Sequence, residues 1–299
     1  MNKFRSSRMP LAGLLVAGLL TLPVWAAGAG KGFGLSIKVH GAFNYLQASD
    51  VNAGAGGYID LYKTMWEEFG FTTEGKYKPF HGSYGFGADF IFSISPRLGL
   101  GIGVGYLQGS GKSRLDVDTG AETGWLLDKP KLSAMPIRLG LFASWPVGKK
   151  LSLIANAGAA YYADVKFRSA MRIEEEATGD WLEQSIAAKM NRFGNVGFQG
   201  GLGVEYALAP RMFVFFEALG RYARFKNFPS ATWNYDFSDG SHIDETGKIY
   251  LVTETTPDWT ITMFTVSETE PPSVPEATVR EPKFDFSGFA FQVGFRVKL

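Results

Sequence analysis

Apolar side chains at every second residue are the feature that most limits how this chain can fold. The segment 84–94, YGFGADFIFSI, places Tyr, Phe, Ala and Ile at its even positions, and its odd positions are small or polar except for Ile91. Successive side chains of a strand point to opposite faces. The segment therefore predicts a β-strand with one apolar face and one small or polar face.

The same alternation recurs along the chain and predicts eight strands. They cover about 33–45, 83–94, 98–106, 137–145, 151–161, 198–208, 212–222 and 289–299. The seventh is the least regular, because its charges at Glu217 and Arg221 leave Phe213 and Phe215 on the charged face. Each strand is about the length that a tilted strand needs to cross a bilayer.

The connections between these strands alternate between short and long. Tight turns rich in Pro, Gly and polar residues occupy 95–97, 146–150 and 209–211, whereas longer polar loops are expected at about 46–82, 108–134, 163–195 and 224–287. Short turns at one end and long loops at the other are typical of an outer-membrane barrel. A soluble sandwich is the alternative, but it has no reason to separate loop lengths by side. Because a free sheet edge in hydrocarbon is costly, strand eight is expected to pair with strand one.

The first thirty residues indicate export. Lys3, Arg5 and Arg8 precede a short apolar run, and small residues follow, so 1–29 reads as a signal peptide cleaved after Ala26 or Ala29. An uncleaved anchor helix is the alternative. Without this segment 27 basic and 29 acidic residues remain, which gives no basic excess for nucleic acid. The chain has no Cys, which excludes disulfides and thiolate metal sites.

Aromatic residues in the outward phase predict two interfacial girdles. Counting about ten residues from each tight turn leads to one set, which comprises Tyr45, Tyr84, Tyr106, Tyr161 and Tyr222. The opposite girdle would contain Phe33, Phe92, Trp145 and Tyr206. Tyrosine suits such a position because its ring is apolar while its hydroxyl stays in water.

This combination resembles the small outer-membrane β-barrel proteins of Gram-negative bacteria, including the OmpA transmembrane domain, OmpX, OmpW and the Opa adhesins. The resemblance covers residues 30–299 and lies in the layout rather than in a diagnostic motif. It implies that the last strand, FAFQVGFRVKL, is read by the barrel-assembly machinery. Leu299 stands last, where members of the family typically have Phe or Trp.

Charged residues in the inward phase are the candidate functional set. They are Lys38, Asp89, Arg138, Glu205, Glu217, Arg221 and Arg296. An eight-stranded barrel is only wide enough to be filled by its own side chains, and isolated buried charges are costly. The mixed signs favour a salt-bridge network that plugs the lumen, and the alternative is the lining of a thin solute path.

Two other patterns resemble a nucleotide-binding motif and a metal-binding motif, but neither has the required spacing. The glycines of GLGIGVGYLQGSGKS, 99–113, lack the spacing of both a dinucleotide turn and a phosphate loop, and they fit an inward face that leaves room for neighbouring side chains. The acidic segments at 116–122, 174–176 and 236–245 lack calcium-loop spacing. We therefore expect no cofactor and no metal.

One short motif raises the question of catalysis. His81-Gly82-Ser83 resembles the His-x-Ser of the lipid A deacylases, but its phase points Ser83 inward and no acidic partner is indicated. His40, in the inward phase, and His242 are not grouped with a nucleophile. We therefore predict that the protein is not an enzyme.

The long connections contain some regular structure. Apolar residues at helical spacing in 58–70 predict an amphipathic helix on the barrel mouth or the membrane surface. The segment 249–266 reads as a hairpin around Thr256-Pro257-Asp258, either outside the membrane or as two further strands of a ten-stranded barrel. Residues 267–282 are Pro-rich and acidic and are expected to be mobile.

The functional hypothesis is a monomeric outer-membrane barrel with a structural or surface-interaction role through its outer loops. A narrow channel for small or apolar solutes is the second hypothesis, and a lipid A-modifying hydrolase is a distant third. The expected partners are outer-membrane lipid and lipopolysaccharide, the barrel-assembly machinery and an extracellular ligand.

Overall fold

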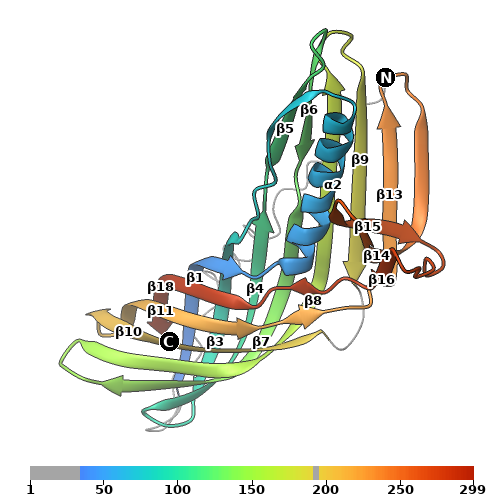
Figure 1. Ribbon diagram of the computed structural model, residues 1–299. Helices are drawn as coiled ribbons and strands as arrows, with labels where there is room; N and C mark the ends of the chain where they lie inside the picture. Colours follow the sequence, from blue (N-terminus) through green and yellow to red (C-terminus); the bar gives the residue numbers. More distant parts are fainter. Residues whose placement is uncertain (1–33, 191–194) are drawn as a thin grey trace.

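The computed structural model describes residues 34–190 and 195–299. A barrel occupies one end of the molecule, and a β-rich extension rises from its rim around a helix (Figure 1). The signal-peptide segment 1–29 and Phe33 lie outside the described residues. No helix in the described part of the chain is long and apolar enough to cross a membrane.

The barrel closes with eight antiparallel strands, as predicted. In spatial order they are β1 (Gly34–Leu46), β3 (Gly82–Ser93), β4 (Leu98–Ser110), β7 (Lys131–Pro146), β8 (Leu151–Glu175), β10 (Val196–Ala209), β11 (Met212–Tyr222) and β18 (Gly288–Lys298). The last strand pairs with the first, with Val39 opposite Phe295. The three tight turns connect β3 to β4, β7 to β8 and β10 to β11. We call this end of the barrel the turn end and the opposite end the mouth.

The two faces of the barrel wall differ as the alternation predicts. The outer face remains bare and apolar, with Leu202 71% exposed and Phe289 70% exposed. The inner face carries charged and amide side chains that are almost fully buried, among them Lys38, Glu217 and Gln292. An apolar patch of this extent is costly in water and favourable in lipid.

The glycine stripe of β4 gives the lumen its room. A Cβ on Gly103 would overlap the carboxylate of Asp89, and a Cβ on Gly101 would overlap the ring of Phe142. Gly103 also lies opposite Arg138 on β7. The glycines therefore accommodate the lumen side chains of the neighbouring strands, which is the role that the sequence indicates for them.

The four long connections, predicted as mainly polar loops with one helix and one hairpin, contain regular structure throughout. Their further strands are β2 (Thr72–Gly75), β5 (Ser113–Asp118), β6 (Thr123–Asp128), β9 (Trp181–Met190), β12 (Arg224–Phe225), β13 (Ser230–Phe237), β14 (His242–Thr255), β15 (Thr260–Ser267), β16 (Ala277–Arg280) and β17 (Phe284–Asp285). Strand β8 runs past the mouth without interruption, and β6 and β9 pair with its distal half. The sheet then continues through β13 and β14 to β15.

The hairpin predicted in the last loop is present as β14 and β15. It belongs to the extension, where Thr255 lies opposite Thr260, and it is not part of the closed barrel. The ten-stranded alternative is therefore wrong. Residues 267–282 are not wholly irregular either, because β16 pairs with β14.

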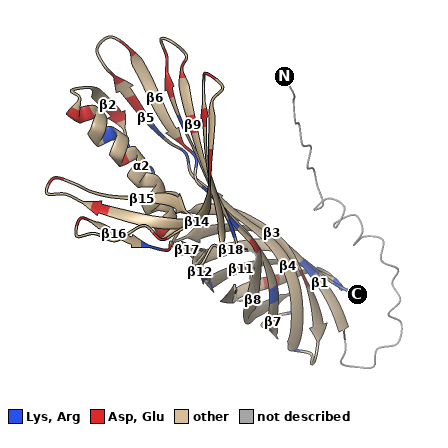
Figure 2. Cartoon of the chain, turned by 90° about the vertical axis from the view of Figure 1, so that its right-hand side faces the viewer, with Lys and Arg blue, Asp and Glu red and all other residues tan. Residues whose placement is uncertain are grey.

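Helix α2 (Ser49–Glu68) lies between the hairpins of the extension (Figure 2). It starts nine residues before the predicted position, in the segment SDVNAGAGG, which has low helix propensity. Tertiary contact explains the difference. Gly54 faces the ring of Phe264, and Gly57 faces the carbonyl of Thr262 so closely that any Cβ would overlap it. The glycines let the helix backbone approach β15.

A hydrophobic core sits directly above the barrel mouth. Its centre is aromatic: the ring of Phe167 lies 4.9 Å from that of Phe264 and 5.0 Å from that of Phe284, between centroids. Leu46, at the end of β1, and Ile59, on α2, are completely buried in the same core. The extension and the barrel rim therefore share one core.

An ion pair fixes the start of the helix to the far end of the chain. Both terminal nitrogens of Arg280 donate to the Asp50 carboxylate, at 2.5 and 2.9 Å, and the Lys283 backbone N–H adds a third bond. These bonds hold the pKa of Asp50 below its usual value despite the opposing effect of burial. Part of the segment expected to be mobile is thereby tied to α2.

Candidate functional site: the charged lumen

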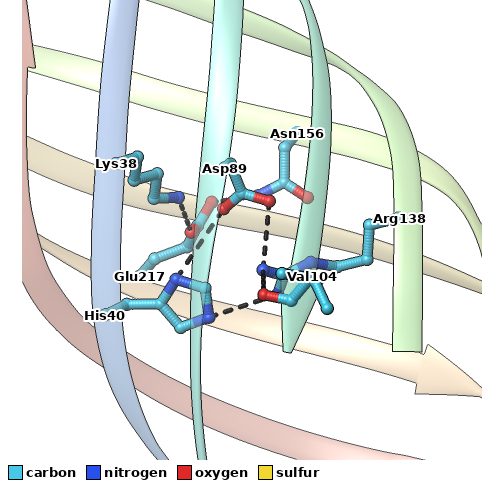
Figure 3. Close-up of polar contacts among 7 residues, drawn as sticks. All are labelled: Lys38, His40, Asp89, Val104, Arg138, Asn156 and Glu217. Carbon is cyan, nitrogen blue, oxygen red and sulfur yellow. Dashed lines mark hydrogen bonds and ion pairs between the residues drawn. The ribbon is translucent and has the colours of Figure 1, made fainter. Parts of the chain in front are cut away.

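A buried ion pair crosses the middle of the lumen. The Lys38 ammonium on β1 lies 2.6 Å from the Glu217 carboxylate on β11, and the two side chains are 5% and 1% exposed. Asn156 on β8 also donates to Glu217 (Figure 3). The Lys38 ammonium lies 4.3 Å from the centre of the Phe215 ring, which adds a cation–π contact. These contacts join three strands across the barrel.

A second group lies beside the first. An Arg138 terminal nitrogen is 3.0 Å from the Asp89 carboxylate, and its other terminal nitrogen is 3.1 Å from Nε2 of His40. Figure 3 shows Arg138, Asp89 and His40 converging in the lumen. Nδ1 of His40 faces Asp89 at 3.7 Å. The guanidinium thus links β7 to both β1 and β3.

A third pair occupies the turn end of the lumen. The Arg296 guanidinium on β18 lies 2.5 Å from the Glu205 carboxylate on β10. The ring of Phe213 receives cation–π contacts from Arg296 and Lys298, at 5.0 and 4.7 Å. Six of the seven charged residues singled out in the sequence therefore form three ion pairs.

Arg221, the seventh, differs from the others. Its guanidinium donates to the Asn44 side-chain oxygen at 3.2 Å, and among the described residues no carboxylate pairs with it. The sequence suggests that inward charges of opposite sign form ion pairs, and Arg221 does not follow this prediction. It lies nearest the mouth, below the shared aromatic core.

The space that remains in the lumen is small. A cavity of about 70 Å³ at the turn end is bordered by Lys38, Glu205, Glu217 and Arg296. A second space of about 10 Å³ lies between Asp89, Arg138 and Gln199. One water needs roughly 10–15 Å³. The first cavity therefore accommodates a few waters and the second about one, and neither is large enough for an organic solute.

The described aromatic residues of the two expected girdles lie on the outer face. Tyr45, Tyr84, Tyr222, Trp145 and Tyr206 are 43–58% exposed. Tyr106 and Tyr161 are half-buried, and the Tyr106 hydroxyl donates to Gln108, which in turn donates to Tyr84. Phe92 is exposed near the turn end.

A sequence comparison agrees with this architecture. The outer membrane protein beta-barrel domain family matches residues 12–246, more than half of the chain. The chain belongs to this family. It is an integral β-barrel protein of the outer membrane, and its turn end corresponds to the periplasmic side and its extension to the outside.

Solved structures of several outer-membrane barrels resemble this one distantly. OprG from Pseudomonas aeruginosa is 12% identical with a TM-score of 0.38, over 91% of this chain and 98% of that one. The outer membrane protease OmpT from Escherichia coli is 8% identical with a TM-score of 0.36, over 90% and 95%. The CymD monoaromatic hydrocarbon channel is 10% identical with a TM-score of 0.28, over 91% and 89%. Among curated proteins, no sequence matches this outer-membrane barrel.

The His-x-Ser motif of this barrel has structural contacts. The His81 ring stacks on Tyr45 at 4.9 Å between centroids, and its Nδ1 lies 2.9 Å from the Leu46 carbonyl. Ser83 is buried on the inner face, as its phase predicts. The described residues contain no group of three or more His, Asp or Glu side chains placed to hold a metal ion.

Sequence reasoning missed the residues that complete the lumen network. Asn156 donates a hydrogen bond to Glu217, and Asn44 accepts one from Arg221. The ring of Phe215 covers the Lys38 ammonium. His40 also lies in the inward phase, beside the charged residues that the sequence singles out. Its position two residues from Lys38, on the same face, is the signal that could have found it.

A buried carboxyl in the extension is electrostatically unusual. Asp128, at the end of β6, is 1% exposed and accepts a bond of 2.7 Å from the Ser169 hydroxyl. Burial raises the pKa of Asp128 to about 7, and this bond only partly opposes the shift. The carboxyl therefore titrates near neutral pH.

We expect Asp128 to make the extension less stable as pH rises. Between the unfolded pKa of 3.8 and the folded pKa of about 7 the folded state binds the extra proton, so the contribution to stability is complete below pH 3.8 and lost above 7. The full difference is on the order of 4 kcal/mol. Asp128→Asn should remove this slope, which thermal unfolding between pH 5 and 8 would measure. Equal slopes in the two proteins would contradict the assignment.

Proposed function

We propose that this protein is a membrane-anchored binding platform, in which the barrel is the anchor and the extension presents a preformed surface outside the cell. The observation that carries this proposal is the aromatic core shared by the extension and the barrel rim. Phe167, Phe264 and Phe284 are completely buried at its centre. A segment packed on a core that is anchored to the barrel keeps its surface in one conformation, which lowers the entropy lost on binding.

The charge distribution favours one class of partner. The distal hairpin tips are predominantly acidic (Figure 2), with Asp118, Glu122, Glu176 and Asp180 exposed there. Carboxylates at the far end of a rigid extension attract cationic groups and steer their approach. A partner with a basic surface is therefore the best match in charge.

The lumen supports an anchor rather than a conduit. Three ion pairs cross it, and the aromatic core covers its outer end. A second candidate function is a narrow channel, and the cavity of about 70 Å³ between Lys38 and Arg296 is the observation in its favour. Because that cavity is confined to the turn end and the aromatic core covers the mouth, we favour the platform.

Single-channel recording distinguishes the two functions. We expect the refolded protein in a planar bilayer to show no sustained conductance, because the ion pairs and the core block the path. A sustained current that changes when Arg138→Gln or Glu205→Gln is introduced would favour the channel and contradict the anchor. Lys149→Gln, at an exposed periplasmic turn, is the control.

A further inference from the structure

Basic side chains gather on the outer wall where the barrel passes into the extension. We call six of them the basic band: Lys112, Lys129, Lys131, Lys166, Arg168 and Lys189. Lys131 on β7 and Arg168 on β8 are exposed and alternate with the buried residues Leu132 and Phe167. They therefore point away from the core, on the face that continues the lipid-facing wall.

The register places like charges directly opposite each other. Lys131 pairs with Arg168 between β7 and β8, and Lys166 pairs with Lys189 between β8 and β9. The registers of the flanking strands place Lys112 opposite Lys129. Like charges at opposed positions of a sheet are destabilising. Three adjacent pairs of this kind are not explained by folding stability.

Few carboxylates of the protein itself lie close enough to neutralise the basic band. Asp164, at a β-bulge in β8, lies 2.5 Å from the Lys166 ammonium and 3.5 Å from the Lys189 ammonium. Among the described residues, no carboxylate lies within ion-pair distance of Lys131 or Arg168. The basic band therefore has six cations and one neighbouring anion, a local excess of positive charge.

The height of the band matches the headgroup layer. Lys166 follows Tyr161 by five residues along β8, across the bulge. With a rise of about 3.3 Å per residue and a tilt of about 40°, Lys166 lies on the order of 10 Å above the tyrosine girdle. Tyrosine girdles mark the boundary of the hydrocarbon. The band is thus outside the apolar layer but close to its surface.

We propose that the basic band binds the phosphate groups of the outer-leaflet glycolipid, lipopolysaccharide. Opposed side chains on neighbouring strands are about 5 Å apart, so two cations can contact one phosphate. Bound phosphate removes the repulsion within each pair, which explains why the pairs are tolerated. A soluble acidic protein is a poorer match, because the band lies beside the membrane surface. This inference does not depend on the platform function.

Lipid binding by the full-length protein tests the proposal. The protein would be folded in a neutral detergent and titrated with lipopolysaccharide, and bound lipid would be counted by native mass spectrometry. Lys131→Gln/Arg168→Gln should weaken binding on the order of 30-fold, at about 5-fold for each charge near a membrane surface. The same variant without lipid should be as stable as the unaltered protein or more so, because a repulsive pair is removed.

Two controls make the result decisive. Arg97→Gln/Lys149→Gln removes one Arg and one Lys from exposed periplasmic turns and should leave binding unchanged. Dephosphorylated lipopolysaccharide should bind the unaltered protein as weakly as intact lipopolysaccharide binds the band variant. Equal loss in both double variants, or equal binding of the dephosphorylated lipid, would overturn the proposal. Equal stabilisation by inorganic phosphate would show a site for free anions instead.

Discussion

Replacing Glu217 by alanine is expected to destabilise the folded barrel by about 3 kcal/mol, because it leaves the Lys38 ammonium buried without its anion. The Lys38 side chain is only 5% exposed, and Asn156 would lose an acceptor as well. Breaking a buried pair generally costs 3–5 kcal/mol. We expect about the lower value, since the adjacent cavity of about 70 Å³ admits water to the ammonium.

Urea unfolding of the protein in lipid vesicles measures this loss through tryptophan fluorescence. Lys38→Met/Glu217→Leu removes both charges and should recover most of the lost stability, because replacing a buried pair by apolar residues is often neutral. Glu268→Ala, at an exposed position directly after β15, is the matched control and should change little. If Glu217→Ala and Glu268→Ala behave alike, the pair does not stabilise the lumen.

The barrel could be predicted from the sequence because the features that determine it occur within short segments of the chain. The strand period, the tight turns and the sign of each inward residue are visible in segments of about ten residues, and closure follows from the cost of a free edge in lipid. The choice of partners was not predictable in the same way. Lys38 pairs with Glu217, 179 residues away, and not with Asp89 directly opposite it on β3.

Apart from the hairpin β14–β15 and the second half of α2, the extension could not be predicted, because its strands are fixed by contacts between distant segments of the chain. Residues 163–175 look like the start of a polar loop, yet they continue β8, since β6 and β9 pair with its two edges. The first half of α2 is similarly hidden by Gly54 and Gly57, which lower its helix propensity and appear as turn signals. The close contact between the helix and β15, which leaves no room for a Cβ, explains why glycine stands at these two positions.

Gly57→Leu is expected to destabilise the extension by about 3 kcal/mol or more while leaving the barrel intact. In an isolated helix, replacing Gly by Leu is favourable by less than about 1 kcal/mol. Here the new Cβ would overlap the Thr262 carbonyl, so the helix must move away from β15. That movement opens the core around Ile59 and Phe264, both completely buried.

Limited proteolysis of the folded protein separates the two parts. The variant should lose the extension to protease at concentrations that leave the unaltered protein intact, while its barrel keeps heat-modifiable migration on gels. Ala53→Leu adds a side chain of the same size on the exposed face of α2 and should behave like the unaltered protein. If the extension of Gly57→Leu resists protease equally, α2 does not hold it together, and the preformed surface that the platform requires has another origin. If the barrel unfolds as well, the shared core at the mouth couples the two parts into a single cooperative unit.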